Sequence, residues 1–272
     1  MSHLMNNYGR LPVSFDHGQG VWLWDKEGHK YLDALAGIAV NSVGHAHPRL
    51  VRAIADQASK LIHCSNYFNI DLQEKVAEKL VEHSGLEAVF FCNSGLEANE
   101  CAIKIARKFG HTKGIEVPNI IVLKHAFHGR SIATLSATGN PSVREDFSPY
   151  TEGFIFVDES DLNGIRKIVE ENKNVVAIFF EPILGEGGVV PIDLSVIKGI
   201  REICDEHDLL MMCDEVQCGM GRSGKWFAHQ WAEIKPDVIT MAKGLAGGVP
   251  VGAVIVSEKA NIFKPGNHGS TF

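Results

Sequence analysis

The stretch Leu209-Leu210-Met211-Met212-Cys213-Asp214-Glu215-Val216-Gln217 places an uninterrupted apolar run directly before a carboxylate. A short run with no alternating polar positions is typical of a strand buried on both faces of a sheet. Ligands of open α/β sheets bind beyond the carboxyl ends of the strands. Asp214 is therefore expected at the buried end of a central strand, where its charge needs a partner. That partner is either a structural arginine or a cofactor nitrogen.

Further short apolar runs share this character and alternate with amphipathic segments along the chain. Buried strands that alternate with helices predict an α/β fold with a mostly parallel sheet and helices on both faces. The runs are residues 88–92, 120–123, 153–157, 175–180, 238–241 and 251–256, and the amphipathic segments are residues 96–109, 161–172 and 194–207.

The beginning of the chain has a different pattern. Residues 21–33 contain two short aromatic and β-branched runs around an Asp/Glu/Gly turn, which predicts a hairpin. Pro48 is then followed by apolar residues at helical spacing and is expected to begin a helix. The pattern separates an N-terminal segment, residues 1–60, from a large domain, residues 61–272.

The composition excludes several classes of partner. The chain has 272 residues and a formal charge of −7, and this mild, dispersed acidity argues against nucleic acid and anionic membranes. The apolar runs are far shorter than the ~20 residues that span a bilayer. None of the six cysteines forms a Cys-x-x-Cys pair, and no charged-then-apolar leader opens the chain. We therefore expect a cytoplasmic protein with reduced thiols.

Two other strand ends carry residues suited to a phosphate-bearing cofactor. Asn93-Ser94-Gly95 opens a helix, whose free N–H groups can bind a phosphate, although an ordinary helix cap has the same residues. Lys243 follows an apolar run and precedes a glycine-rich turn. Desolvation there would make its amine a nucleophile or base, whereas most such lysines only extend to solvent at a sheet edge. Together with Asp214, these groups match what pyridoxal phosphate requires.

Other candidate chemistries have weaker support. His45-x-His47 and His125-x-x-His128 lack the His-Glu-x-x-His pattern and a nearby cysteine pair, so we expect no metal site. The chain contains no Gly-x-Ser-x-Gly elbow of a serine hydrolase. Arg130 could bind a carboxylate through two hydrogen bonds, or form a surface salt bridge.

Six motifs follow one another along the chain, at residues 37–48, 93–100, 127–130, 181–188, 214–222 and 242–244. In this order they resemble the class III, fold type I pyridoxal-phosphate aminotransferases. The resemblance extends from about Gly20 to Phe272. It implies a fold type I α/β domain, preceded by the N-terminal part of a small second domain. The C-terminal part of that small domain is expected to lie outside this chain.

The resemblance also implies a role for individual residues. Lys243 would bond to the cofactor and then move a proton, and Asp214 would pair with the pyridinium nitrogen. Leu96 stands where the family usually has a small residue or threonine, a mild departure because the backbone makes the contact. The other implied contacts are Gln217 with the ring hydroxyl, Val216 and Phe127 with the ring faces, Glu215 with the cofactor, Ser94, Gly95 and Leu96 with the phosphate, Thr271 with the phosphate of a partner subunit, and Ser270, Arg130 and the switch residue Glu186 with substrate.

The implied reaction is a transamination in a homodimer whose subunits share their active sites. We expect the terminal amine of N2-acetylornithine to pass to 2-oxoglutarate, giving N-acetylglutamate 5-semialdehyde and glutamate, a step of arginine biosynthesis. Ornithine, succinylornithine and 4-aminobutyrate are the alternative donors, because family members that use them share most of the motifs. A different interpretation is a catalytically incomplete protein that binds the cofactor or a partner.

Overall fold

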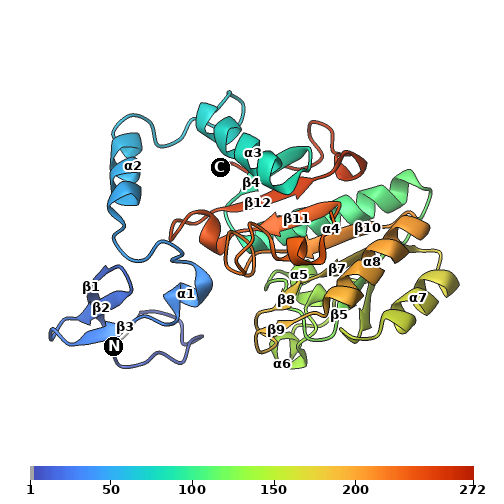
Figure 1. Ribbon diagram of the computed structural model, residues 1–272, viewed down its shortest axis with the longest axis horizontal. Helices are drawn as coiled ribbons and strands as arrows, with labels where there is room; N and C mark the ends of the chain where they lie inside the picture. The colour runs from blue at the N-terminus through green and yellow to red at the C-terminus, as the bar shows by residue number, and fades with distance from the viewer. Residues whose placement is uncertain (1–2) are drawn as a thin grey trace. The chain divides into compact units, whose positions relative to one another are not determined.

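The computed structural model describes residues 3–272 of the chain. The chain divides into two compact units, Met1–Ile62 and His63–Phe272 (Figure 1). The sequence analysis placed this boundary after residue 60. The second unit contains the large sheet and the candidate site.

The large sheet has the predicted α/β character. Within the described residues its strand order is β4-β12-β11-β10-β7-β5-β6. Only β12 runs against its two neighbours, so the sheet is mostly parallel, as predicted. Each predicted apolar run forms one of its strands, namely β4 (Ala88–Cys92), β5 (Asn119–Leu123), β6 (Phe154–Val157), β7 (Val175–Phe180), β10 (Leu210–Asp214), β11 (Val238–Met241) and β12 (Gly252–Val256).

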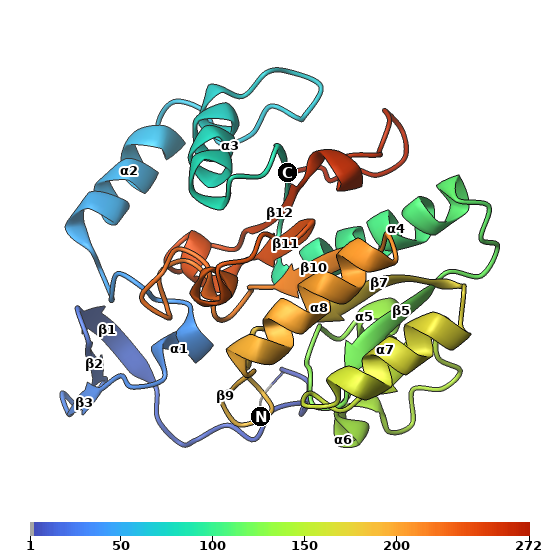
Figure 2. The ribbon, with the colours of Figure 1, turned by 45° about the vertical axis from the view of Figure 1, so that its right-hand side comes forward.

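Helices cover both faces of the large sheet. Ile120 and Val122 of β5 pack into the cluster that includes α4 (Gly95–Thr112). Ile121 and Leu123 point to the other face and pack with α7 (Leu162–Glu171) and α8 (Leu194–Glu206). Figure 2 shows α7 and α8 side by side in front of the sheet, with α4 behind it. Continuous apolar strands are needed because both faces are buried.

A third apolar cluster lies against β11 and β12. Leu80 of α3 (Asp71–Ser84) and Phe227 pack there with Ile239 and Ile255.

None of the helices within residues 3–272 combines the length and the apolar character needed to cross a bilayer. The remaining short elements of this unit are α5 (Ile132–Ala137), α6 (Pro141–Arg144), β8 (Ile183–Leu184), β9 (Val190–Pro191), η1 (Ala228–Ala232), η2 (Lys243–Leu245) and η3 (Glu258–Ala260).

The first unit contains a three-stranded antiparallel sheet, β1 (Phe15–Gln19), β2 (Trp22–Asp25) and β3 (Lys30–Leu32). The predicted hairpin is formed by β2 and β3, with Trp22 opposite Leu32. Strand β1 was not predicted. Pro48 is the first residue of α2 (Pro48–Ala58), as predicted.

The segment α1 (Ala36–Ala39) has an unusual backbone. All four of its residues have positive φ angles, between 51° and 66°. This is the left-handed region, which costs a residue other than glycine roughly 1–2 kcal/mol. Gly37 is the only residue of the four that adopts it without this cost.

Candidate active site

A cavity of about 280 Å³ lies where β4, β5, β7, β10 and β11 end. Residues that follow these strands line it, so it occupies the carboxyl edge of the sheet, where open α/β sheets bind ligands. Of the predicted site residues, it brings together Gly95, Leu96, Phe127, Arg130, Asp214, Val216, Gln217 and Lys243.

Asp214 is the last residue of β10, and its side chain is 3% exposed. One carboxylate oxygen, Oδ2, accepts hydrogen bonds from Asn99 Nδ2 at 2.7 Å and from His128 Nδ1 at 2.8 Å. The other, Oδ1, accepts the Val216 N–H at 3.0 Å. These donors stabilise a negative charge on a carboxylate that the apolar strand would otherwise disfavour.

Lys243 follows β11 and begins the short turn η2. Burial lowers the pKa of its ammonium group, while the nearby acidic groups, led by Asp214 and followed by Glu181 and Glu186 when they are ionised, oppose that shift. A lower pKa leaves more of the amine neutral and therefore nucleophilic. Its φ of 44° lies in the left-handed region, a strained geometry often found at functional sites.

The first turn of α4 forms the opposite wall of the cavity. Gly95 has no side chain there for a steric reason: a Cβ atom would lie 2.7 Å from a methyl group of Val216. The first N–H groups of a helix lack partners within the helix, and both Gly95 and Leu96 line the cavity. Ser94 caps the helix by accepting the Glu97 N–H at 3.2 Å, and it is not among the lining residues.

Some predicted site residues lie elsewhere. The side chain of Glu215 is buried away from the cavity lining, and it accepts the backbone N–H groups of Ala228 and His229 at 2.7 and 2.8 Å. Glu186, Ser270 and Thr271 are also not among the lining residues. Their contacts with cofactor and substrate therefore stay predictions.

Three polar residues at the cavity were not predicted to contact a cofactor or substrate: Glu181, Asn99 and His128, of which His128 was considered only as a metal ligand. Glu181 directly follows the apolar run of β7, the same signal that identified Asp214. Asn99 and His128 have no such signal. They meet Asp214 only because the fold brings α4 and the loop after β5 beside β10.

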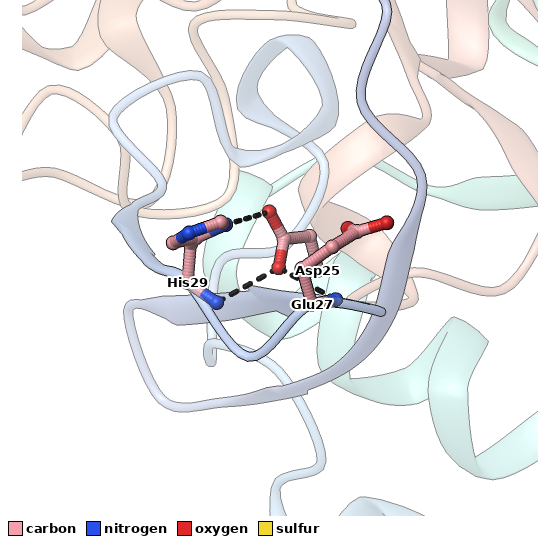
Figure 3. A group of neighbouring side chains, drawn as sticks. All are labelled: Asp25, Glu27 and His29. Atoms are coloured by element: carbon pink, nitrogen blue, oxygen red, sulfur yellow. Dashed lines mark hydrogen bonds and ion pairs between the residues drawn. The ribbon is translucent and has the colours of Figure 1, made fainter.

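A cluster of Asp25, Glu27 and His29 has a spacing that could hold a metal ion (Figure 3). The Asp25 carboxylate already accepts the N–H groups of Glu27 and His29, at 3.1 and 2.8 Å, together with the His29 ring at 2.9 Å. The Tyr31 hydroxyl donates a fourth hydrogen bond to it at 2.9 Å. These bonds shape the turn between β2 and β3, which accounts for the cluster.

Residues 4–272 match the family model Aminotransferase class-III. The chain belongs to the class III aminotransferases. Among curated relatives, this aminotransferase is 55% identical over 273 residues to acetylornithine aminotransferase of Nitrosomonas europaea, covering 100% of this chain and 70% of the relative. It is 52% identical over 272 residues to acetylornithine aminotransferase 1 of Bordetella parapertussis, covering 100% of this chain and 69% of the relative.

Solved structures of aminotransferases share the fold. Ornithine aminotransferase from Toxoplasma gondii ME49 superposes with a TM-score of 0.94 at 35% identity, covering 99% of this chain and 65% of that one. N-acetylornithine aminotransferase from Stenotrophomonas maltophilia K279a has a TM-score of 0.81 at 39% identity, covering 93% of this chain and 64% of that one. The aminotransferase chain thus spans 64–70% of the length of these four proteins.

Class III aminotransferases depend on pyridoxal phosphate, and the residues of this aminotransferase fit that cofactor. A buried carboxylate, a lysine with a lowered pKa and a helix N-terminus line one cavity. These are the groups that a pyridinium nitrogen, an aldehyde carbon and a phosphate require. The apolar side chains of Phe127 and Val216 line the same cavity and suit the faces of an aromatic ring.

Proposed function

We propose that this aminotransferase moves the terminal amine of N2-acetylornithine to 2-oxoglutarate, giving N-acetylglutamate 5-semialdehyde and glutamate in arginine biosynthesis. The observation that carries this substrate is the 50–55% identity to proteins named acetylornithine aminotransferase. Ornithine is the second candidate donor, supported by the TM-score of 0.94 with an ornithine aminotransferase at 35% identity.

When bound, pyridoxal phosphate supplies an electron sink for the reacting carbon. Asp214 then binds the ring nitrogen and keeps its proton in place, since its own charge is held by three donors. Lys243 would hold the cofactor through its side-chain amine and would act as the base that moves the proton at the carbon that carries the transferred amine. Phe127 and Val216 cover the ring and exclude water.

The remaining contacts orient the cofactor and the substrates. The N-terminus of α4 binds the phosphate through the N–H groups of Gly95 and Leu96, and Gln217 binds the ring hydroxyl. Arg130 lies at the cavity and binds the substrate carboxylate. Glu186 acts as the switch between amino donor and 2-oxoglutarate.

The enzyme acts as a cytoplasmic homodimer with shared sites, and its first unit is part of a small domain. In the second unit, two hydrogen bonds hold Ser270. Its carbonyl accepts one from Asn66 at 2.8 Å, and its hydroxyl accepts one from Asn93, beside the start of α4, at 3.3 Å. These contacts support a position of Ser270 near substrate and of Thr271 near the phosphate of the partner subunit.

A comparison of amino donors tests the substrate. N2-acetylornithine, ornithine, N2-succinylornithine and 4-aminobutyrate are each offered to the full-length protein with 2-oxoglutarate and pyridoxal phosphate. We expect the highest kcat/KM with N2-acetylornithine. A higher value with another donor would reject the proposed substrate while leaving the reaction class in place, and no turnover with any donor would favour a protein that only binds the cofactor.

A further inference from the structure

The cavity holds a second buried carboxyl group besides Asp214. Glu181 directly follows β7, and β7 pairs with β10 so that Phe180 lies opposite Cys213. The two acidic residues therefore lie at the ends of neighbouring strands, at the same edge of the sheet. Glu181 is 5% exposed and lines the cavity with Asp214 and Lys243.

The two carboxyl groups have different hydrogen-bond partners. Asp214 accepts from two side chains and one backbone N–H, with the distances given above. Among residues 3–272, the donors to Glu181 are backbone groups alone, the Phe127 N–H at 2.9 Å to Oε2 and the Gly185 N–H at 3.2 Å to Oε1. When two acids share a buried site, the one with fewer donors keeps its proton.

The surrounding charges agree with this division. Burial, followed by the charge of Asp214, raises the pKa of Glu181 to about 8, against the opposing effects of the Phe127 and Gly185 hydrogen bonds and of Lys243. The other ionisable side chains that line the cavity are His128 and Arg130, from the loop after β5. His128 already donates a hydrogen bond to Asp214, and the guanidinium carbon of Arg130 lies 5.7 Å from the centre of the Phe127 ring.

One oxygen of Glu181 lies on the side of Gln217. Oε1 accepts the Gly185 N–H at 3.2 Å, and Gly185 packs against the amide of Gln217. A Cβ atom on Gly185 would lie only 2.3 Å from Gln217 Oε1. A proton carried by Oε1 is therefore on the side of the cavity where Gln217 ends.

We propose that Glu181 remains protonated at neutral pH and, with Gln217, donates a hydrogen bond to the ring oxygen of bound pyridoxal phosphate, an inference that rests on the proposed function. A neutral acid stabilises an ionised ring oxygen, whereas a second carboxylate would repel it. The site therefore contains one charged acid for the ring nitrogen and one neutral acid for the ring oxygen.

Infrared spectroscopy tests the protonation state without cofactor or turnover. Wild-type apoprotein should show a carboxylic-acid C=O band at pH 6.5 that disappears as the pH rises through about 8. Glu181→Gln should lack this band, and Glu186→Gln, which changes an acid outside the cavity lining, should retain it. A wild-type spectrum identical to that of Glu181→Gln in this region would overturn the neutral state.

Cofactor titration tests the hydrogen bond. The affinity for pyridoxal phosphate is measured for wild type and for Glu181→Gln across pH. Above pH 8 the ratio of the wild-type affinity to the Glu181→Gln affinity should fall by up to about tenfold for each pH unit, because binding requires one proton on Glu181. Glu181→Gln keeps a neutral donor and should lack this dependence, while Glu181→Ala should bind about tenfold more weakly at pH 7. Folding of each variant is checked by circular dichroism.

A cofactor analogue separates a direct contact from a general structural effect. With 3-deoxypyridoxal 5′-phosphate, which lacks the ring hydroxyl, wild type and Glu181→Ala should bind equally. An equal loss with both ligands would overturn the contact. Failure of N2-acetylornithine to react would reject only the proposed donor, whereas unchanged cofactor affinity in Glu181→Ala would reject this inference even in an enzyme that uses acetylornithine.

Discussion

Lys243 combines two features that are unfavourable for an ordinary lysine. Its amine is desolvated and its backbone lies in the left-handed region. Both are expected where the rest of the site fixes a side chain for chemistry rather than for stability. Gly247 and Gly248 in the turn that follows also have positive φ angles, which glycine adopts without this strain.

Replacing Lys243 tests its role directly. Lys243→Ala should lower turnover by ~10²–10⁴-fold, which is the usual contribution of a general acid–base group. Borohydride treatment of the wild-type holoenzyme, followed by peptide mass mapping, should locate the reduced cofactor on Lys243. Lys243→Arg preserves the positive charge but should not be labelled. Labelling of any other lysine in the wild type would contradict the assignment.

Glu181 should make the stability of the apoprotein depend on pH. Its pKa is about 8 in the folded chain and near 4.5 when exposed, so the folded state binds more protons between these values. Stability therefore falls as the pH rises from about 4.5 to 8. Urea unfolding at pH 5.5 and 8.5 should show a smaller difference in Glu181→Gln than in wild type. An equal difference in the two proteins would place an ionised Glu181 in the folded state.

At this scale, sequence reasoning places a residue at the cavity where a polar residue interrupts an apolar run. Asp214 and Lys243 were found in this way, and Glu181 carries the same signal at the end of β7. Asn99 and His128 were not predictable, because they lie 115 and 86 residues from Asp214. Glu215 adjoins Asp214, yet its side chain accepts hydrogen bonds from the start of η1 and does not line the cavity.

The first turn of α4 depends on a close approach that only glycine allows. In Gly95→Ala the new methyl group would meet both methyls of Val216, at 2.7 and 2.8 Å. We expect a loss of about 1–3 kcal/mol in the free energy of unfolding and weaker binding of pyridoxal phosphate. Urea unfolding and fluorescence titration measure the two effects.

A double variant provides the control for Gly95→Ala. Gly95→Ala combined with Val216→Ala removes the methyl groups that cause the clash, so most of the lost stability should return. Strictly additive losses in the two single variants would show that the close approach is not the cause.

Elements were predictable where both faces are buried. The strands of the large sheet have continuous apolar sequences because helices cover each face, and no other pattern fits that environment. Strand β1 contains Asp16, His17 and Gly18, which have low strand propensity, and it forms only by pairing with β2. The left-handed segment α1 contains Ala36 and Ile38, whose own preference is right-handed, so local sequence cannot predict it.

At the scale of the whole molecule, the residues that line the cavity come from one sheet edge of a single chain, whereas Ser270 and Thr271 are not among them. The proposed homodimer with shared sites would account for the position of Thr271, because each subunit would then supply the loop that completes the other cavity.

Mixed dimers test this arrangement. Lys243→Ala and Thr271→Ala chains are unfolded together, refolded and assayed at limiting pyridoxal phosphate. If Thr271 acts across the interface, each mixed dimer contains one site with both Lys243 and Thr271. Random mixing should then restore roughly a quarter of wild-type activity, since half of the dimers are mixed and each has one intact site. If Thr271 acts within its own chain, the Lys243 site of a mixed dimer still lacks Thr271, and activity stays at the mean of the two parents. Refolding the two variants separately before mixing gives the baseline, and recovery no greater than that baseline would rule out a shared site.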